Sequence, residues 1–191
     1  MENRLLESLQ DGEQLLWSGR PQSVGTLQGI YKTAIVRKIL CIGAAIIILA
    51  GWYIFAAVKN GVAVQPIAII VCALPFLYSI YNDFADAKLL RQSVLYAMTD
   101  RRMITVINKT VSAVEYEHVG AWKVEADADG VVSLVCGEDA LKRKETSRRE
   151  GAVCGVRTNL DTGLCESYVM YGITEDADKV AEIIAKYILC L

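Results

Sequence analysis

Two stretches without a charged side chain, residues 39–58 and 60–82, limit more than any other feature what this chain can fold into. The first stretch lies between Lys38 and Lys59. About 20 helical residues, at a rise of about 1.5 Å each, are enough to cross a hydrocarbon core of about 30 Å. Backbone polar groups cannot face lipid unpaired, so both stretches should be helices. The sequence therefore predicts a transmembrane hairpin over 37–83, with spans at about 39–58 and 62–82.

Two other interpretations of the apolar stretches are disfavoured. Helices enclosed in a soluble all-helical core can also be apolar on every side. The chain is 22% charged and still reaches a mean hydropathy of +0.32, which favours the bilayer. A secretory signal is disfavoured because acidic residues such as Glu2 and Asp11 precede the first stretch.

Basic residues are concentrated before the first apolar stretch and after the second. The connection between the two stretches has only one, Lys59. They are Arg20, Lys32, Arg37 and Lys38 before the first stretch, and Lys88, Arg91, Arg101 and Arg102 after the second. Cytoplasmic flanks of spanning helices carry the excess of Lys and Arg. We therefore expect a multi-pass protein of the cell membrane with both termini in the cytoplasm.

Charge and cysteine usage argue against several classes of function. A net charge of −2 and a pI near 5.5 are not those of a nucleic-acid-binding protein. The six cysteines are scattered without a Cys-x-x-Cys pair, and His118 is the only histidine. No nucleophile motif, glycine-rich phosphate loop or metal-ligand spacing is present in the sequence. We expect no enzyme, no metal and no cofactor.

The sequence predicts that residues 88–191 form an antiparallel β-unit closed by a helix. Residues 1–36 are expected to be an N-terminal segment before the hairpin. Strand patterns occupy 93–107, with a turn at Thr99–Arg102, then 112–126, 131–136, 152–157 and 165–173. Asp127–Gly130 is interpreted as a tight turn rather than a calcium loop. The last pattern is one helical apolar stripe, formed by Val180, Ile183, Ile184, Tyr187, Ile188 and Leu191.

Three short motifs resemble those of a known family. Glu13–Pro21, with Trp17, Gly19 and Pro21, resembles a segment that precedes the spans in small bacterial membrane proteins with a pleckstrin-homology-like (PH-like) domain. Tyr96–Ile104, with Tyr96, Thr99, Arg101 and Arg102, is similar to the opening strand of that domain, and Glu166–Ile173 to its last strand. The resemblance covers the N-terminal segment, the hairpin and both ends of the domain.

The resemblance implies a PH-like β-sandwich or partly open barrel of about seven strands, capped by the C-terminal helix and without known catalytic residues. The fold class is then membrane α+β. On physical grounds Thr99, Arg101 and Arg102 suit a turn whose arginines hold carbonyls or carboxylates, or face the nearby membrane.

The loop 138–150 is the candidate contact surface for anionic lipid or a partner. Its basic residues are Lys142, Arg143, Lys144, Arg148 and Arg149. Each could gain about 1 kcal/mol near an anionic leaflet. Four acidic residues are interleaved with them, however, and a simple solvated loop is the preferred interpretation.

These patterns favour a membrane-anchored, non-catalytic binding or scaffolding module on the cytoplasmic face. It would dock a protein partner or assemble with copies of itself through the small residues Gly43, Ala44 and Gly51 of the first span. The alternative is a module that engages anionic lipid through the basic loop. A membrane-associated enzyme and a transporter subunit are less favoured.

The N-terminal segment is too short for a core of its own. It should therefore pack on the domain or lie at the membrane surface.

Overall fold

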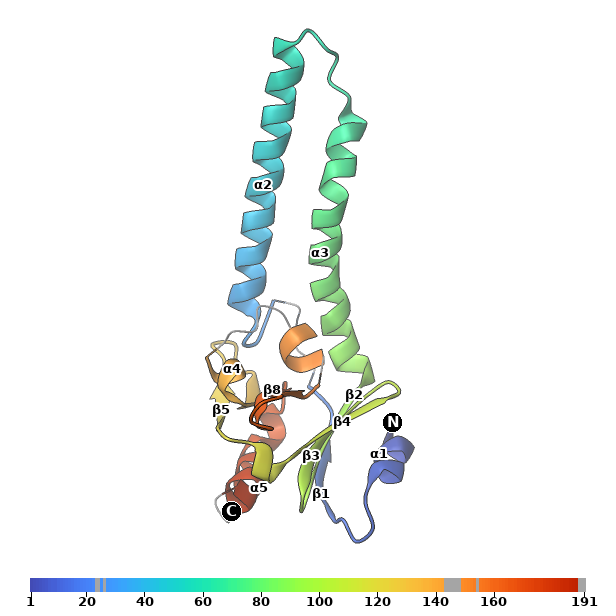
Figure 1. Ribbon diagram of the computed structural model, residues 1–191, viewed down its shortest axis with the longest axis vertical. Coiled ribbons are helices and arrows are strands. Elements are labelled where there is room, and N and C mark those ends of the chain that lie inside the picture. The colour runs from blue at the N-terminus through green and yellow to red at the C-terminus, as the bar shows by residue number, and fades with distance from the viewer. Residues whose placement is uncertain (23–24, 26, 143–148, 154, 189–191) are drawn as a thin grey trace.

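The structure is a computed structural model that describes residues 1–22, 25, 27–142, 149–153 and 155–188. Two long antiparallel helices, α2 (Lys32–Lys59) and α3 (Pro66–Ser93), stand away from a β-rich part that is formed by the segments before and after them (Figure 1). Both helices are long and apolar enough to cross a membrane, and almost none of the most apolar part of either is buried. Within this chain they do not form an enclosed core.

Each helix is longer than the apolar stretch that predicted it. Both have 28 residues, and the added turns all lie at the end next to the β-rich part, where Ile35 of α2 and Leu90 of α3 are buried. One side of these turns packs on the domain, while exposed side chains such as Lys88 and Arg91 lie on the other. The helices therefore continue directly into the domain.

The first sheet joins the two sides of the hairpin. Its four antiparallel strands are β1 (Leu15–Gly19), β2 (Val94–Thr99), β3 (Arg102–Ile107) and β4 (Thr110–Glu115), in that order. β1 precedes α2 in the chain and β2 follows α3, yet Trp17 pairs with Met98. The N-terminal segment thus packs on the domain as an edge strand rather than lying apart from it.

The second sheet has four antiparallel strands in the order β5-β6-β8-β7. They are β5 (Trp122–Ala126), β6 (Val132–Cys136), β7 (Arg157–Thr158) and β8 (Cys165–Met170). The strand expected over 152–157 is wrong. Arg149–Val153 instead forms a helical turn, η2, and extended pairing begins only at Arg157. The turn lies where Arg149 donates to Asp86 of α3.

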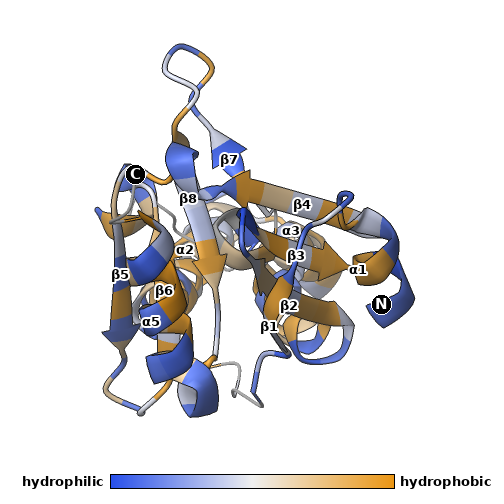
Figure 2. Ribbon diagram, turned by 90° about the horizontal axis from the view of Figure 1, so that it is seen from below, coloured by the Kyte–Doolittle hydropathy of each residue, from blue (hydrophilic) through white to orange (hydrophobic). Residues whose placement is uncertain are grey.

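The main core lies between the two sheets and under α5 (Ala177–Ile188). Figure 2 shows the sheets and α5 from the side away from the hairpin. Val180 and Ile184 of the predicted stripe are buried, and Ile183, Tyr187 and Ile188 pack against the core, whereas Leu191 lies outside the described residues. The helix predicted at the C-terminus is confirmed over the described part.

A smaller core lies on the other face of the first sheet. There Leu5 of α1 (Glu2–Ser8) packs against Leu95, Ala97, Ile104 and Val106. Strand β2 is consequently covered on both faces, and all six of its residues are buried. Short helical elements complete the fold: η1 (Tyr116–His118), α4 (Glu138–Leu141) and η3 (Thr174–Asp176). The described residues form two antiparallel four-stranded sheets and a C-terminal helix below a helical hairpin.

Candidate functional site

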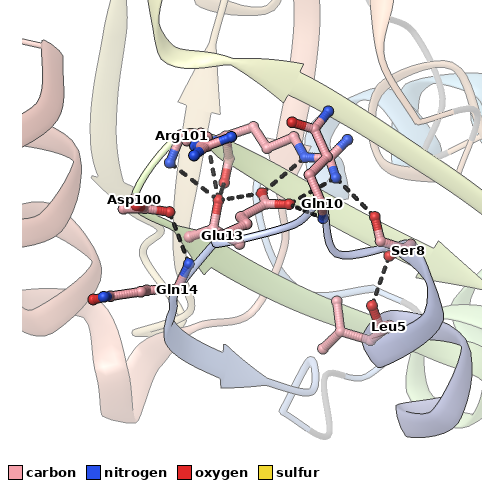
Figure 3. A network of polar contacts seen from close by, with 9 residues as sticks. Leu5, Ser8, Gln10, Glu13, Gln14, Asp100 and Arg101 are labelled. Carbon is pink, nitrogen blue, oxygen red and sulfur yellow. Dashed lines mark hydrogen bonds and ion pairs between the residues drawn. The ribbon is translucent and has the colours of Figure 1, made fainter.

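A buried carboxylate organises the turn between β2 and β3. Glu13 Oε1 accepts hydrogen bonds from Thr99 Oγ1 at 2.7 Å and Arg102 Nε at 2.9 Å, and Oε2 accepts from Arg102 Nη2 at 2.9 Å. The backbone N–H of Gln10 adds a bond of 2.7 Å to Oε2. We define the Glu13 network as Glu13, Thr99 and Arg102; Figure 3 shows Glu13 and its polar contacts, with Gln10 beside it. It ties the N-terminal segment to the first sheet.

Electrostatics explain why this carboxylate is stable in the interior. The hydrogen bonds from Arg102 outweigh the cost of burial and lower the pKa of Glu13 to about 2. The same contact raises the pKa of Arg102. Thr99 Oγ1 also accepts the backbone N–H groups of Arg101 and Arg102, at 3.2 and 3.0 Å. The Thr-Asp-Arg-Arg motif therefore forms a closed turn whose second arginine points inward.

Arg101 points instead toward an open groove beside the Glu13 network. The groove has a volume of about 340 Å³. Its lining residues are Gln10, Asp100, Arg101, Arg102, Glu115, Tyr116, Glu117 and Tyr187. The rings of Tyr116 and Tyr187 stack at 5.5 Å, and Tyr116 donates its hydroxyl to the carbonyl of Thr99. Since β2 runs away from the end of α3, this polar and aromatic groove lies on the side of the domain remote from the hairpin.

A donor cluster borders the groove. One carboxylate oxygen each of Glu115 and Glu117 and one imidazole nitrogen of His118 lie within 4.8 Å of one another. The His118 ring is about half exposed, and its Nδ1 lies 3.6 Å from Glu115 Oε2. The sequence Glu-Tyr-Glu-His brings these groups together, although the sequence predicts no metal site. The cluster is open to water, and its geometry alone assigns it no ion.

A second polar cluster lies where the hairpin meets the domain. Asp83 Oδ2 accepts from Lys38 Nζ of α2 at 2.9 Å. Asp86 accepts from Arg149, at 2.7 Å from Nη2 and 3.2 Å from Nε. Both carboxylates are only 2% exposed, so each needs its cation. We call Lys38, Asp83, Asp86 and Arg149 the hairpin foot; it joins α2, α3 and the η2 turn.

The hairpin foot was missed by sequence reasoning. Lys38 was counted only for orientation, and Arg149 only as part of the basic loop. The available signal was Asp83 and Asp86 three residues apart at the end of an apolar stretch, which places both on one helix face. The cations that pair with these two carboxylates come from positions far apart in the chain, and no local sequence pattern identifies them.

The basic loop is described only at its ends. Lys142 bonds to Glu138 at 2.6 Å, and both side chains are exposed. Arg149 is engaged with Asp86. Arg143, Lys144 and Arg148 lie outside the described residues. Contact of this loop with lipid or a partner therefore stays a prediction.

The remaining motif residues lie within the fold. Trp17 is in the main core, and a Cβ added to Gly19 would collide with its indole ring. Pro21 is buried. Tyr96 is fully buried, and its hydroxyl accepts the backbone N–H of Tyr171 at 3.1 Å. Of the residues singled out in the first and second motifs, Arg101 alone has an exposed side chain beside a groove.

Comparison with protein-family models, curated proteins and solved structures finds no significant match. The resemblance to PH-like domains therefore stays an expectation from the sequence motifs. The structure itself shows two antiparallel four-stranded sheets and a C-terminal helix.

Proposed function

We propose that this protein is a non-catalytic binding or scaffolding module, anchored in the cell membrane by its hairpin and carrying a cytoplasmic PH-like domain. The observation that carries the proposal is the outward-facing apolar surface of α2 and α3. Large side chains such as Ile47, Trp52 and Ile67 are 73%, 71% and 67% exposed. Apolar surface costs about 25 cal/mol per Å² in water, and a bilayer removes that cost.

The hairpin foot supports an anchored platform rather than a loosely tethered domain. Its two ion pairs are joined by a third, between Lys32 of α2 and Asp129 of the turn after β5, at 2.9 Å. The direct run from α3 into β2 leaves no linker between them. A module held in this way presents the same face of its domain at the same height above the membrane.

The groove beside Arg101 supports protein docking at the remote side of the domain. Aromatic rings and arginine are the side chains that most often anchor protein interfaces. Here Tyr116, Tyr187 and Arg101 share one groove of about 340 Å³ with three carboxylates. A partner segment with polar and apolar contacts, basic residues included, suits this lining.

Self-assembly is the other form of the proposal, and α2 supports it. Ala44 and Gly51 are exposed on this helix, and a Cβ added to Gly43 or Gly51 would meet nothing within 4 Å. Small residues let a second helix approach closely in a bilayer. Both forms assign the protein a role in assembly rather than catalysis.

The test is chemical crosslinking of the full chain in its native membranes, followed by purification in mild detergent. Docking predicts a crosslinked partner that is lost in Arg101→Glu and kept in Lys179→Glu, an exposed control on α5. Self-assembly predicts a crosslinked dimer that is lost in Gly51→Leu. A chain recovered as an uncrosslinked monomer, with both variants like the parent, would contradict the proposal.

A further inference from the structure

The outward face of α3 changes from apolar to basic as the helix approaches the domain. Its large side chains follow one another at spacings of three and four residues and are exposed: Ile70, Leu74, Leu77, Tyr81 and Phe84. Lys88 and Arg91 continue the same stripe and are also exposed. Residues at these spacings share one face of a helix. The stripe is therefore continuous and ends in two cations.

The acidic residues of the same turns are on the opposite side. Asp83 and Asp86 are buried and neutralised by Lys38 and Arg149. In the described part of the chain Lys88 has no carboxylate partner, and Arg91 donates only to the carbonyl of Ala87 in its own helix, at 3.3 Å. The helix thus separates its charges, with the acids inward and paired and the bases outward.

Side-chain size decides what covers this face. Helices that pack together in a bilayer use small residues at the contact. The α3 stripe consists of large side chains. The cleft toward α2, in contrast, is lined in part by small residues of α3, namely Ala68, Cys72 and Ala73. A stripe of this kind is suited to lipid chains rather than to a second helix.

The order of residues along the axis of α3 then indicates the level at which the lipid head groups would lie. Aromatic rings settle at the boundary between lipid and water, which is where Tyr81 and Phe84 would lie. Lys88 follows Phe84 by four residues, about 6 Å along the helix. That distance brings its ammonium group to the level of the phosphates.

We propose that Lys88 and Arg91 form a contact site for the phosphates of anionic phospholipids at the cytoplasmic leaflet. The inference rests on the proposed membrane anchoring and moves the lipid contact from the basic loop to α3. Each cation near an anionic surface contributes about a five-fold gain in affinity, so the pair should account for about 30-fold. The attraction should weaken as salt is raised.

The test uses the full chain in detergent, with phosphatidylglycerol as the probe and phosphatidylcholine and inorganic phosphate as comparisons. Native mass spectrometry at increasing lipid measures the concentration for half occupancy. Lys88→Gln with Arg91→Gln should raise it about 30-fold for phosphatidylglycerol and leave phosphatidylcholine unchanged. Arg20→Gln with Lys179→Gln, two exposed basic residues outside α3 and the basic loop, should leave both unchanged.

Charge-conserving exchange keeps the test decisive if the double variant folds poorly. Lys88→Arg with Arg91→Lys should retain the preference for phosphatidylglycerol. Equal binding of the two lipids by the parent, or an unchanged half-occupancy in the glutamine variant, would overturn the inference. Displacement of the lipid by inorganic phosphate at similar concentration would identify a free-phosphate site and overturn it too. Extraction of the protein by alkaline carbonate would instead refute membrane anchoring, which separates the two failures.

Discussion

Nη2 of Arg102 lies 2.9 Å from Oε2 of Glu13, a residue 89 positions earlier in the chain and on the other side of the helical hairpin. The Glu13 side chain has no exposed surface and is held entirely by donors from three segments. The ion pair therefore closes the first sheet at the end remote from the helices. Its energetics give the first prediction.

Stability should fall at acidic pH through Glu13. Its pKa is about 2 in the folded protein against an ordinary value of 4.5, so its contribution is fully present above pH 4.5 and is lost as the pH falls toward 2. The difference between the two pKa values corresponds to roughly 3 kcal/mol. Thermal unfolding in detergent from pH 6 to 2.5 measures it. Glu13→Gln should be less stable at pH 6 and show a flatter acid profile; a profile as steep as that of the parent would contradict the assignment.

Gly19→Ala should destabilise the first sheet. The added methyl group would overlap the Trp17 indole, which packs in the main core. Overpacking of this kind costs about 1 to 3 kcal/mol. The measurement is the melting temperature together with the near-ultraviolet circular dichroism of the tryptophans. Gly51→Ala is the matched control, because its Cβ meets open space, and it should be neutral or slightly stabilising. Equal effects of the two changes would refute the contact.

The two partners of the buried pair Asp86 and Arg149 should respond unequally to removal. Arg149→Gln leaves a carboxylate that is 2% exposed without its cation and should cost roughly 2 to 4 kcal/mol. Asp86→Asn leaves an arginine that is 57% exposed, and should cost less. The double variant should recover most of the loss from Arg149→Gln, which a double-mutant cycle measures. Lys142→Gln, in an exposed pair, should cost under about 1 kcal/mol.

The hairpin turn should be outside the cell and the domain inside. In a cysteine-free background, Val62→Cys should react with a membrane-impermeant maleimide in intact cells, because this residue is 62% exposed in the turn. Leu160→Cys, at a position 99% exposed between β7 and β8, should react only after permeabilisation. The reverse labelling pattern would invert the orientation expected from the basic residues.

Local patterns predicted the elements whose contacts are local. The uncharged stretches gave α2 and α3, and the apolar stripe gave α5. The strands around the Thr99–Arg102 turn were also predicted, because β2 and β3 are joined by a tight turn. In each case the pattern of apolar residues that is typical of the element is present in the local sequence.

Elements whose conformation depends on residues far away in the sequence were not predicted. Leu15–Gly19 was not identified as a strand, because Leu-Leu-Trp does not alternate and its partner β2 lies beyond the hairpin. The strand expected over 152–157 failed for a related reason: alternation over so few residues does not distinguish a strand from a turn that Arg149 holds to α3. Glu13 belonged to a recognised motif, but its partnership with Arg102 became visible only in three dimensions.

The pairing of β1 with β2 has a consequence for how the protein is made. β1 leaves the ribosome before either long helix, and the strand that completes its hydrogen bonds is synthesised only after both. If the helices insert in a bilayer, the sheet can close only when the chain has crossed twice and returned to the side from which it started. A chain with a single helix threaded would leave the two strands on opposite sides. In that case, a formed pair of β1 and β2 reports that both crossings of the bilayer have been completed.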